Sequence, residues 1–83
     1  MVVTGRVQNI WYRDSCRSEA LARAVAGWVR NRSDGSVEAV FEGPPPSVDE
    51  LVAWCGQGPA WARVEGVETI DEEPRGETTF SIR

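Results

Sequence analysis

The spacing of apolar residues changes from strand-like to helix-like at two places along the chain, and this change constrains the fold more than any other feature. After Tyr12, apolar side chains recur at spacings of three and four, while polar side chains occupy the opposite face, as on one amphipathic helix. A second pattern of this kind follows the prolines at 44–46. The apolar positions are Tyr12, Cys16, Ala20, Leu21, Ala24 and Val25 in the first pattern and Val48, Leu51, Val52 and Cys55 in the second.

The ends of both helices carry sequence signals. We expect the first helix to end at Gly27, because glycine readily adopts the left-handed conformation of a C-cap. Ser47 and Glu50 match a capping box, in which each side chain bonds to a backbone N–H of the other residue, so we expect the second helix to begin there.

Short β-prone segments surround the two helical patterns. Val37, Ala39 and Phe41 alternate with charged residues, which predicts a strand with one wet face, and the Asp-Gly pair before it favours a tight hairpin turn. The expected strands cover residues 1–7, 28–31, 37–42, 62–67 with an irregularity near Gly66, and 78–83.

The predicted order of elements is β-α-β-β-α-β, followed by a short terminal strand. Two helices and a mostly antiparallel sheet predict a two-layer α+β sandwich with both helices on one face, the ferredoxin-like arrangement. A chain of 83 residues has room for one such unit, so we expect residues 1–83 to form a single domain. Trp28 and Trp54 are expected to pack in the core or at its edge.

All nine basic residues of the chain are arginine, and both lysine and histidine are absent. The net charge of −4 disfavours nucleic acid as a partner. No apolar run approaches the roughly 20 residues of a membrane-spanning helix, and the beginning of the chain lacks a secretory signal. We therefore expect a cytoplasmic protein without a membrane partner, and, because there is no apolar excess, a monomer.

Cys16 and Cys55 are the only cysteines. They form no C-x-x-C pair, and without histidine the common zinc sites are missing, so we expect neither a metal nor a cofactor. Two free, buried thiols are the preferred prediction for a cytoplasmic chain, and a disulfide between them stays open as the alternative.

The segment 5–13 joins the end of the first strand to the start of the first helix. Such a junction leaves backbone N–H groups without helical partners beside the positive end of the helix dipole, so a loop curling there can bind an anion. Arg13 can add a planar guanidinium that matches two phosphate oxygens, and Trp11 is expected at the rim. From these residues alone, an anion site and a plain strand–helix connection are equally supported.

No side chain in this segment is equipped to act as a nucleophile. Ser15 has no neighbouring His or Lys to serve as its base, and no Cys–His pair exists. The acidic groups at 49–50 and 71–73 fall at a helix start and in a solvated loop, so neither predicts an acid–base couple. Any hydrolysis at this segment would depend on electrostatics and positioning.

Several blocks of sequence occur in a particular order. They are GRVQNIWYR at 5–13, GWVRN at 27–31, DGSVEAVFEG at 34–43, GPAWARV at 58–64 and FSIR at 80–83. In order and spacing they resemble the acylphosphatase family, whose signature G-x-V-Q-G-V-x-F-R is followed by G-W-V-x-N and D-G-S-V. The resemblance covers nearly the whole chain.

The resemblance implies an enzyme that hydrolyses carboxyl–phosphate mixed anhydrides to a carboxylate and phosphate, without a metal or a covalent intermediate. Its substrate would be a small acyl phosphate, with phosphate or other anions as further ligands. The resemblance implies that Arg13 binds the phosphoryl group and that Asn31 orients the attacking water, although from the residues alone Asn31 fits a turn residue better. It also implies phosphate binding by the backbone N–H groups of Gln8, Asn9, Ile10, Trp11 and Tyr12.

The chain departs from the family pattern in three ways. Asn9 stands where the family usually has glycine, and a positive φ there would strain it. Arg32 follows Asn31 where a small hydroxyl residue is common, which adds charge beside the site. The first strand is also shorter than in typical members, so we expect reduced stability.

Three other interpretations follow from the same residues. A non-catalytic phosphate- or anion-binding domain of the same fold is the main alternative, with Asn9 as its best support. An RNA-binding sheet surface is disfavoured by the acidic charge. A domain cut from a larger enzyme is less expected than a free-standing protein, because the set of elements is complete.

Overall fold

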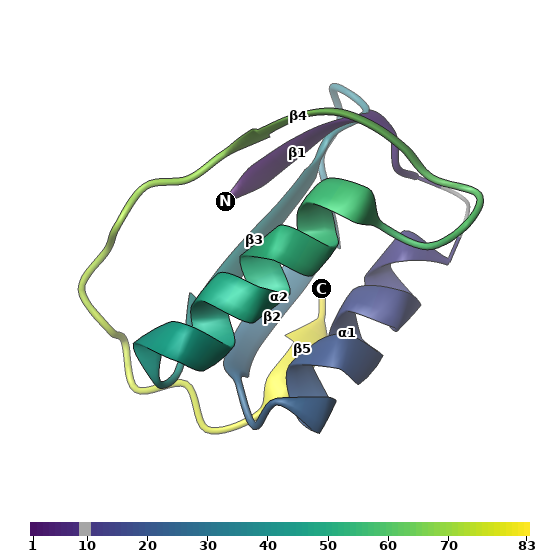
Figure 1. Cartoon of the computed structure of the whole chain (residues 1–83). Helices are drawn as coiled ribbons and strands as arrows, with labels where there is room; N and C mark the ends of the chain where they lie inside the picture. Colours follow the sequence, from purple (N-terminus) through teal and green to yellow (C-terminus); the bar gives the residue numbers. More distant parts are fainter. Residues whose placement is uncertain (9–10) are drawn as a thin grey trace.

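The computed structural model describes residues 1–8 and 11–83 (Figure 1). The elements in chain order are β1 (Val2–Arg6), α1 (Tyr12–Ala22), β2 (Ala26–Asn31), β3 (Val37–Glu42), α2 (Pro45–Gln57), β4 (Arg63–Glu68) and β5 (Phe80–Ile82). This order confirms the predicted β-α-β-β-α-β arrangement with a short terminal strand.

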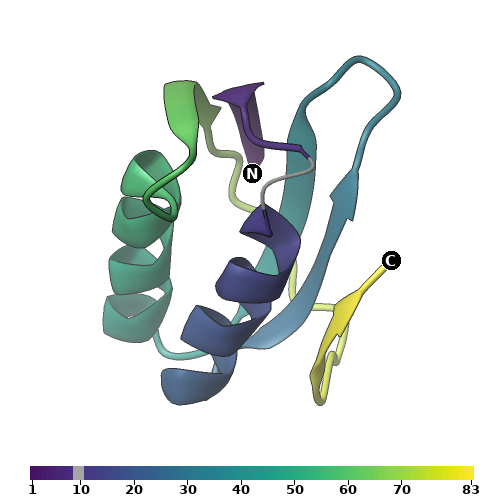
Figure 2. The same ribbon diagram turned by 90° about the vertical axis from the view of Figure 1, so that its right-hand side faces the viewer.

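The strands form one sheet in the order β4-β1-β3-β2-β5. Neighbouring strands in this sheet are antiparallel, except for β2 and β5, which run parallel. Both helices lie on the same face of this sheet, as Figures 1 and 2 show from two directions. The two-layer ferredoxin-like sandwich is therefore confirmed.

The core lies between the helices and the sheet. Its fully buried side chains include Val3 and Val29 from the sheet, Cys16 from α1 and Leu51 and Cys55 from α2. Both cysteines are free and buried, as predicted. The tryptophans expected in the core or at its edge are there, since Trp28 is buried and Trp54 packs against the core cluster.

The first helix ends earlier than the sequence predicts. α1 ends at Ala22, and Ala24 turns the chain with a left-handed φ of 54°. The predicted C-cap at Gly27 is wrong, because Gly27 lies inside β2. Its φ of 139° and its missing Cβ allow the Val40 carbonyl of β3 to approach closely, a role that only glycine fills.

The second helix begins earlier than predicted. α2 starts at Pro45 with Pro44 as its N-cap, and no side chain caps it by a hydrogen bond, so the predicted capping box at Ser47 is wrong. The physical reason is that proline suits the first helical position, where its fixed φ is already helical and its missing N–H needs no partner.

The pairing of β1 with β4 contains the irregularity predicted near Gly66. Thr4 pairs with Gly66 and Gly5 pairs with Val64, so Glu65 is an extra residue in β4. Such a bulge bends the strands and increases their local twist. It lies beside the last residues of β1, where the chain leaves the sheet toward α1.

Candidate active site

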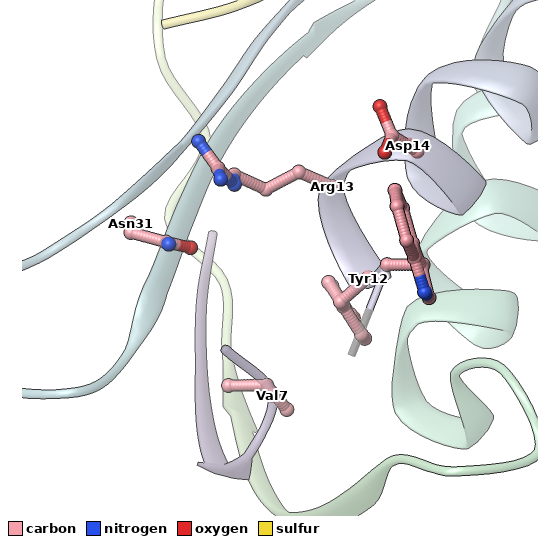
Figure 3. A pocket seen from close by; sticks show the side chains of 6 residues that line it. Val7, Tyr12, Arg13, Asp14 and Asn31 are labelled. Carbon is pink, nitrogen blue, oxygen red and sulfur yellow. The ribbon is translucent and has the colours of Figure 1, made fainter. Parts of the chain in front are cut away.

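A pocket of about 290 Å³ lies where β1 ends, α1 begins and β2 ends (Figure 3). The residues that line it are Val7, Trp11, Tyr12, Arg13, Asp14 and Asn31. Val7 is fully buried just after β1, whereas Trp11 is largely exposed. The pocket therefore has an apolar inner wall and an open mouth.

The pocket lies at the N-terminal end of α1. Trp11, the residue before the helix, has a left-handed φ of 66°, and no side-chain hydrogen bond caps the helix among the described residues. The first N–H groups of any helix have no partner within it and carry the positive end of the helix dipole. This end of the pocket is therefore suited to an anion.

The side chains of Arg13 and Asn31 point toward each other across the pocket (Figure 3). Arg13 belongs to the first turn of α1 and forms no ion pair with any residue in 1–8 or 11–83. Asn31 is the last residue of β2, and its Oδ1 is buried without a hydrogen-bond partner in the described chain. A buried polar atom without a partner costs free energy, so this oxygen is available to accept a hydrogen bond from a bound molecule.

Gln8 ties the hairpin that carries Asn31 to the end of the first strand. Its Nε2 donates to the carbonyl oxygens of Arg32, at 2.8 Å, and Ser36, at 2.9 Å. Ser36 donates its hydroxyl and its N–H to Asp34, and these hydrogen bonds lower the pKa of the Asp34 carboxyl. The hairpin that follows Asn31 is thereby tied to the segment that follows β1.

The charge of Arg32 is paired on the hairpin, outside the residues that line the pocket. Its guanidinium lies 3.8 Å from the Asp34 carboxylate, and Arg32 does not line the pocket. The departure from the family pattern at Arg32 therefore adds an exposed, paired charge on the hairpin.

Tyr12 fixes the start of α1 on the core. Its hydroxyl donates to the Cys55 carbonyl oxygen at 2.8 Å, and its ring lies 5.6 Å from the ring of Trp54. Burial raises the pKa of Tyr12, so its hydroxyl stays protonated and keeps this bond. A hydrogen bond with Cys55 and burial raise the pKa of Cys16, so the Cys16 thiol is not a nucleophile at neutral pH.

The residues that line the pocket supply a guanidinium, a carboxylate and an amide beside the N-terminus of α1. Such a set can bind an oxyanion and orient a water molecule. Within residues 1–8 and 11–83, no cluster of three or more Cys, Asp or Glu side chains is placed to hold a metal ion. None of the helices that the structure describes combines the length and the apolar character needed to cross a membrane.

Residues 1–82 match the family model for acylphosphatase. The chain belongs to this family. The matched range includes every residue that lines the pocket.

Named relatives agree with the family match. The acylphosphatase of Rubrobacter xylanophilus is 57% identical over 83 aligned positions, and the alignment covers 98% of this chain and 74% of the relative. That of Natronomonas pharaonis is 49% identical over 81 residues, which cover 98% of this chain and 88% of the relative. The crystal structure of acylphosphatase from Bacillus subtilis superposes with a TM-score of 0.93 at 36% identity and covers 99% of this chain and 92% of that one. The chain is an enzyme, a hydrolase with acylphosphatase function.

The structure brings most of the predicted site residues to one pocket. Trp11, Tyr12, Arg13 and Asn31 line it, with Trp11 at the mouth as expected. Gln8 is not among the residues that line the pocket; its side-chain amide bonds to the hairpin, and phosphate binding by its backbone N–H stays a prediction. The predictions for Asn9 and Ile10 lie outside the described residues.

Two residues that line the pocket were not predicted from the sequence. Val7 continues the apolar alternation of the first strand, which was a signal for burial but not for a site. Asp14 follows Arg13 in the first turn of α1, and the helical pattern placed it only on the polar face.

Asp14 is expected to weaken anion binding. Replacing Asp14 by asparagine should lower the KM for an acyl phosphate about two- to fivefold at low ionic strength, since an exposed charge is worth roughly 0.2–1 kcal/mol. The same change should destabilise the fold by about 0.3–1 kcal/mol, because a carboxylate stabilises a helix N-terminus. Steady-state kinetics and urea unfolding would measure the two effects, with Asp71→Asn as an exposed control outside the pocket. An unchanged KM at low salt would contradict the expectation.

Proposed function

We propose that the chain hydrolyses carboxyl–phosphate mixed anhydrides by direct attack of water, without a metal ion or a covalent intermediate. The observation that carries the proposal is that two polar side chains without partners among the described residues face each other in one pocket. The guanidinium of Arg13 has no ion-pair partner among the described residues, and it faces the side chain of Asn31, whose amide oxygen is buried and without a partner. In this proposal the two side chains hold the phosphoryl group and the water that attacks it.

Arg13 would bind the phosphoryl group. Its planar guanidinium can donate two parallel hydrogen bonds to phosphoryl oxygens, and the backbone N–H groups at the start of α1 can donate to others. Phosphoryl transfer through a loose transition state spreads charge over the equatorial oxygens, and fixed donors stabilise that charge without reorganising. Arg13 therefore contributes both binding and transition-state stabilisation.

Asn31 would position the water. Its Oδ1 can accept a hydrogen bond from the attacking water, so that a water lone pair points at phosphorus in line with the carboxylate leaving group. The new water–phosphorus bond forms as the bond from phosphorus to the acyl oxygen breaks. The water proton passes to a phosphoryl oxygen, and the carboxylate leaves without a general acid because it is a weak base.

Hydrolysis of benzoyl phosphate in EDTA and ¹⁸O-labelled water tests this function. We expect turnover that inorganic phosphate inhibits competitively, with the label in the phosphate product and none in benzoate. Label in benzoate would mean attack at the carbonyl carbon and would overturn the mechanism. A folded protein that binds phosphate but releases no benzoate would instead be an anion-binding member of the family.

Asn31→Ala should lower kcat for benzoyl phosphate roughly 100-fold and change KM little, because positioning is lost while phosphate binding is kept. The backbone pairing of Asn31 with Val37 does not depend on the side chain, so the fold should be retained. Kinetics together with circular dichroism would measure both. Ser33→Ala, in the same hairpin but outside the pocket, should leave kcat unchanged. A kcat within threefold of wild type for Asn31→Ala would remove Asn31 from the mechanism.

The cellular setting is part of the same proposal. Both cysteines are free, as in proteins of reducing compartments, which supports a place in the cytoplasm. We expect the enzyme to act there as a monomer on small acyl phosphates.

A further inference from the structure

Trp11 is a largely exposed aromatic residue at the pocket. Its side chain is 75% exposed, although tryptophan is usually highly buried and supplies much of the packing in a small core. It lines the pocket directly before the helix that carries Arg13. A large aromatic surface is therefore kept in water at the mouth of an anion site.

The backbone of Trp11 is also held in an uncommon conformation. Its φ of 66° is left-handed, which for a bulky residue without special hydrogen bonding costs free energy. The side chain neither packs into the core nor caps α1 among the described residues. Folding stability thus does not account for an indole at this position.

The pocket offers more than a phosphate site. Its volume of about 290 Å³ exceeds the space that a phosphoryl group occupies, and Val7 and Tyr12 give it an apolar wall beside the polar groups. In an acyl phosphate the acyl group is attached directly to the phosphoryl oxygen. With the phosphoryl group held by Arg13 and the attacking water held by Asn31, the acyl group must extend to a neighbouring part of the pocket or its mouth.

We propose that Trp11 recognises the acyl group and makes the enzyme selective for acyl phosphates with a flat, apolar acyl group over those with a small one. The inference rests on the proposed function. The indole face offers a stacking surface to an aromatic acyl group, whereas an acetyl group is too small to cover it. Arg13 and Asn31 act on the group that all acyl phosphates share, so selectivity comes from a different residue.

The test compares benzoyl phosphate with acetyl phosphate for the wild type, Trp11→Ala and Trp61→Ala. Trp61 is a matched control, because its side chain is 78% exposed and it does not line the pocket. Trp11→Ala should lower the preference for benzoyl over acetyl phosphate, measured as the ratio of their kcat/KM values, about 3- to 10-fold, with most of the loss in the KM for benzoyl phosphate. Trp61→Ala should leave the kinetic constants for both substrates unchanged. Trp11→Phe should keep most of the preference for benzoyl phosphate over acetyl phosphate.

An equal loss with both substrates in Trp11→Ala would overturn the inference, because Trp11 would then act through the backbone that binds phosphate. An unchanged preference would overturn it as well. Calorimetric binding of phenylphosphonate and methylphosphonate separates this inference from the proposed function. If the wild type hydrolyses neither substrate, the proposed mechanism fails. Tighter binding of phenylphosphonate than of methylphosphonate, abolished in Trp11→Ala, would still support Trp11 as the recognition residue. Equal binding of the two phosphonates by the wild type would overturn the inference.

Discussion

Replacing Arg13 by alanine is expected to lower kcat/KM for benzoyl phosphate about 1,000-fold while the protein stays folded. In the described part of the chain, Arg13 is the only cation that lines the pocket, so its loss removes the charged partner of the phosphoryl group. The guanidinium makes no ion pair with the described residues, and its removal therefore should not destabilise the fold. Steady-state kinetics, phosphate binding and circular dichroism measure the three consequences.

Two further variants test whether the effect of Arg13 depends on its charge alone, on its planar guanidinium or on its position in the pocket. Arg13→Lys keeps the charge but loses the planar fork, so it should retain more activity than alanine and less than wild type. Arg6→Ala removes an exposed arginine near the end of β1 that does not line the pocket, and it should retain wild-type kinetics. If Arg6→Ala were as damaging as Arg13→Ala, the net charge of the chain would matter rather than the guanidinium in the pocket.

The two layers of the fold could be predicted because the apolar positions of the local sequence patterns are the positions that tertiary packing buries. The spacing of Tyr12, Cys16 and Ala20 places all three on one side of α1, and all three are buried in the core. The alternation of Val37 and Ala39 likewise corresponds to the buried face of β3. Where burial alone decides the structure, the periodicity of the sequence is sufficient.

The site could be predicted only in part. Arg13 and Asn31 lie in different elements, and no local pattern indicates that they face each other across a pocket. Their association came from the resemblance to a family, whose motifs record that proximity. The amide of Gln8 bonds to the hairpin, 24 and 28 residues further along the chain. Such features are set by contacts between distant segments, so the sequence around each residue does not reveal them.

Gly27 is another residue whose role could not be predicted from the local sequence. A glycine after a helical pattern suggests a helix C-cap, but close contact with another strand is what requires glycine at this position. In β2 it pairs with Phe41 on one side and with Phe80 on the other, in the interior of the sheet. A Cβ at this position would overlap the Val40 carbonyl oxygen and lie 2.8 Å from the carbonyl carbon. Both obstacles are backbone atoms of β3, so they cannot move aside without breaking the ladder.

Gly27→Ala is therefore expected to cost at least about 4 kcal/mol of unfolding free energy, a large share of the roughly 5–15 kcal/mol that small domains have. Urea unfolding followed by tryptophan fluorescence measures the loss. Gly35→Ala is the matched control, since Gly35 also has a positive φ, of 93°, but a Cβ there would meet nothing within 4 Å. That variant carries conformational strain alone and should cost about 1–2 kcal/mol. Equal losses in the two variants would mean that strain, rather than the close approach of β3, requires glycine at position 27. A much larger loss for Gly27→Ala, accompanied by loss of hydrolysis because Asn31 ends the same strand, would assign the requirement to the packing of β2 against β3.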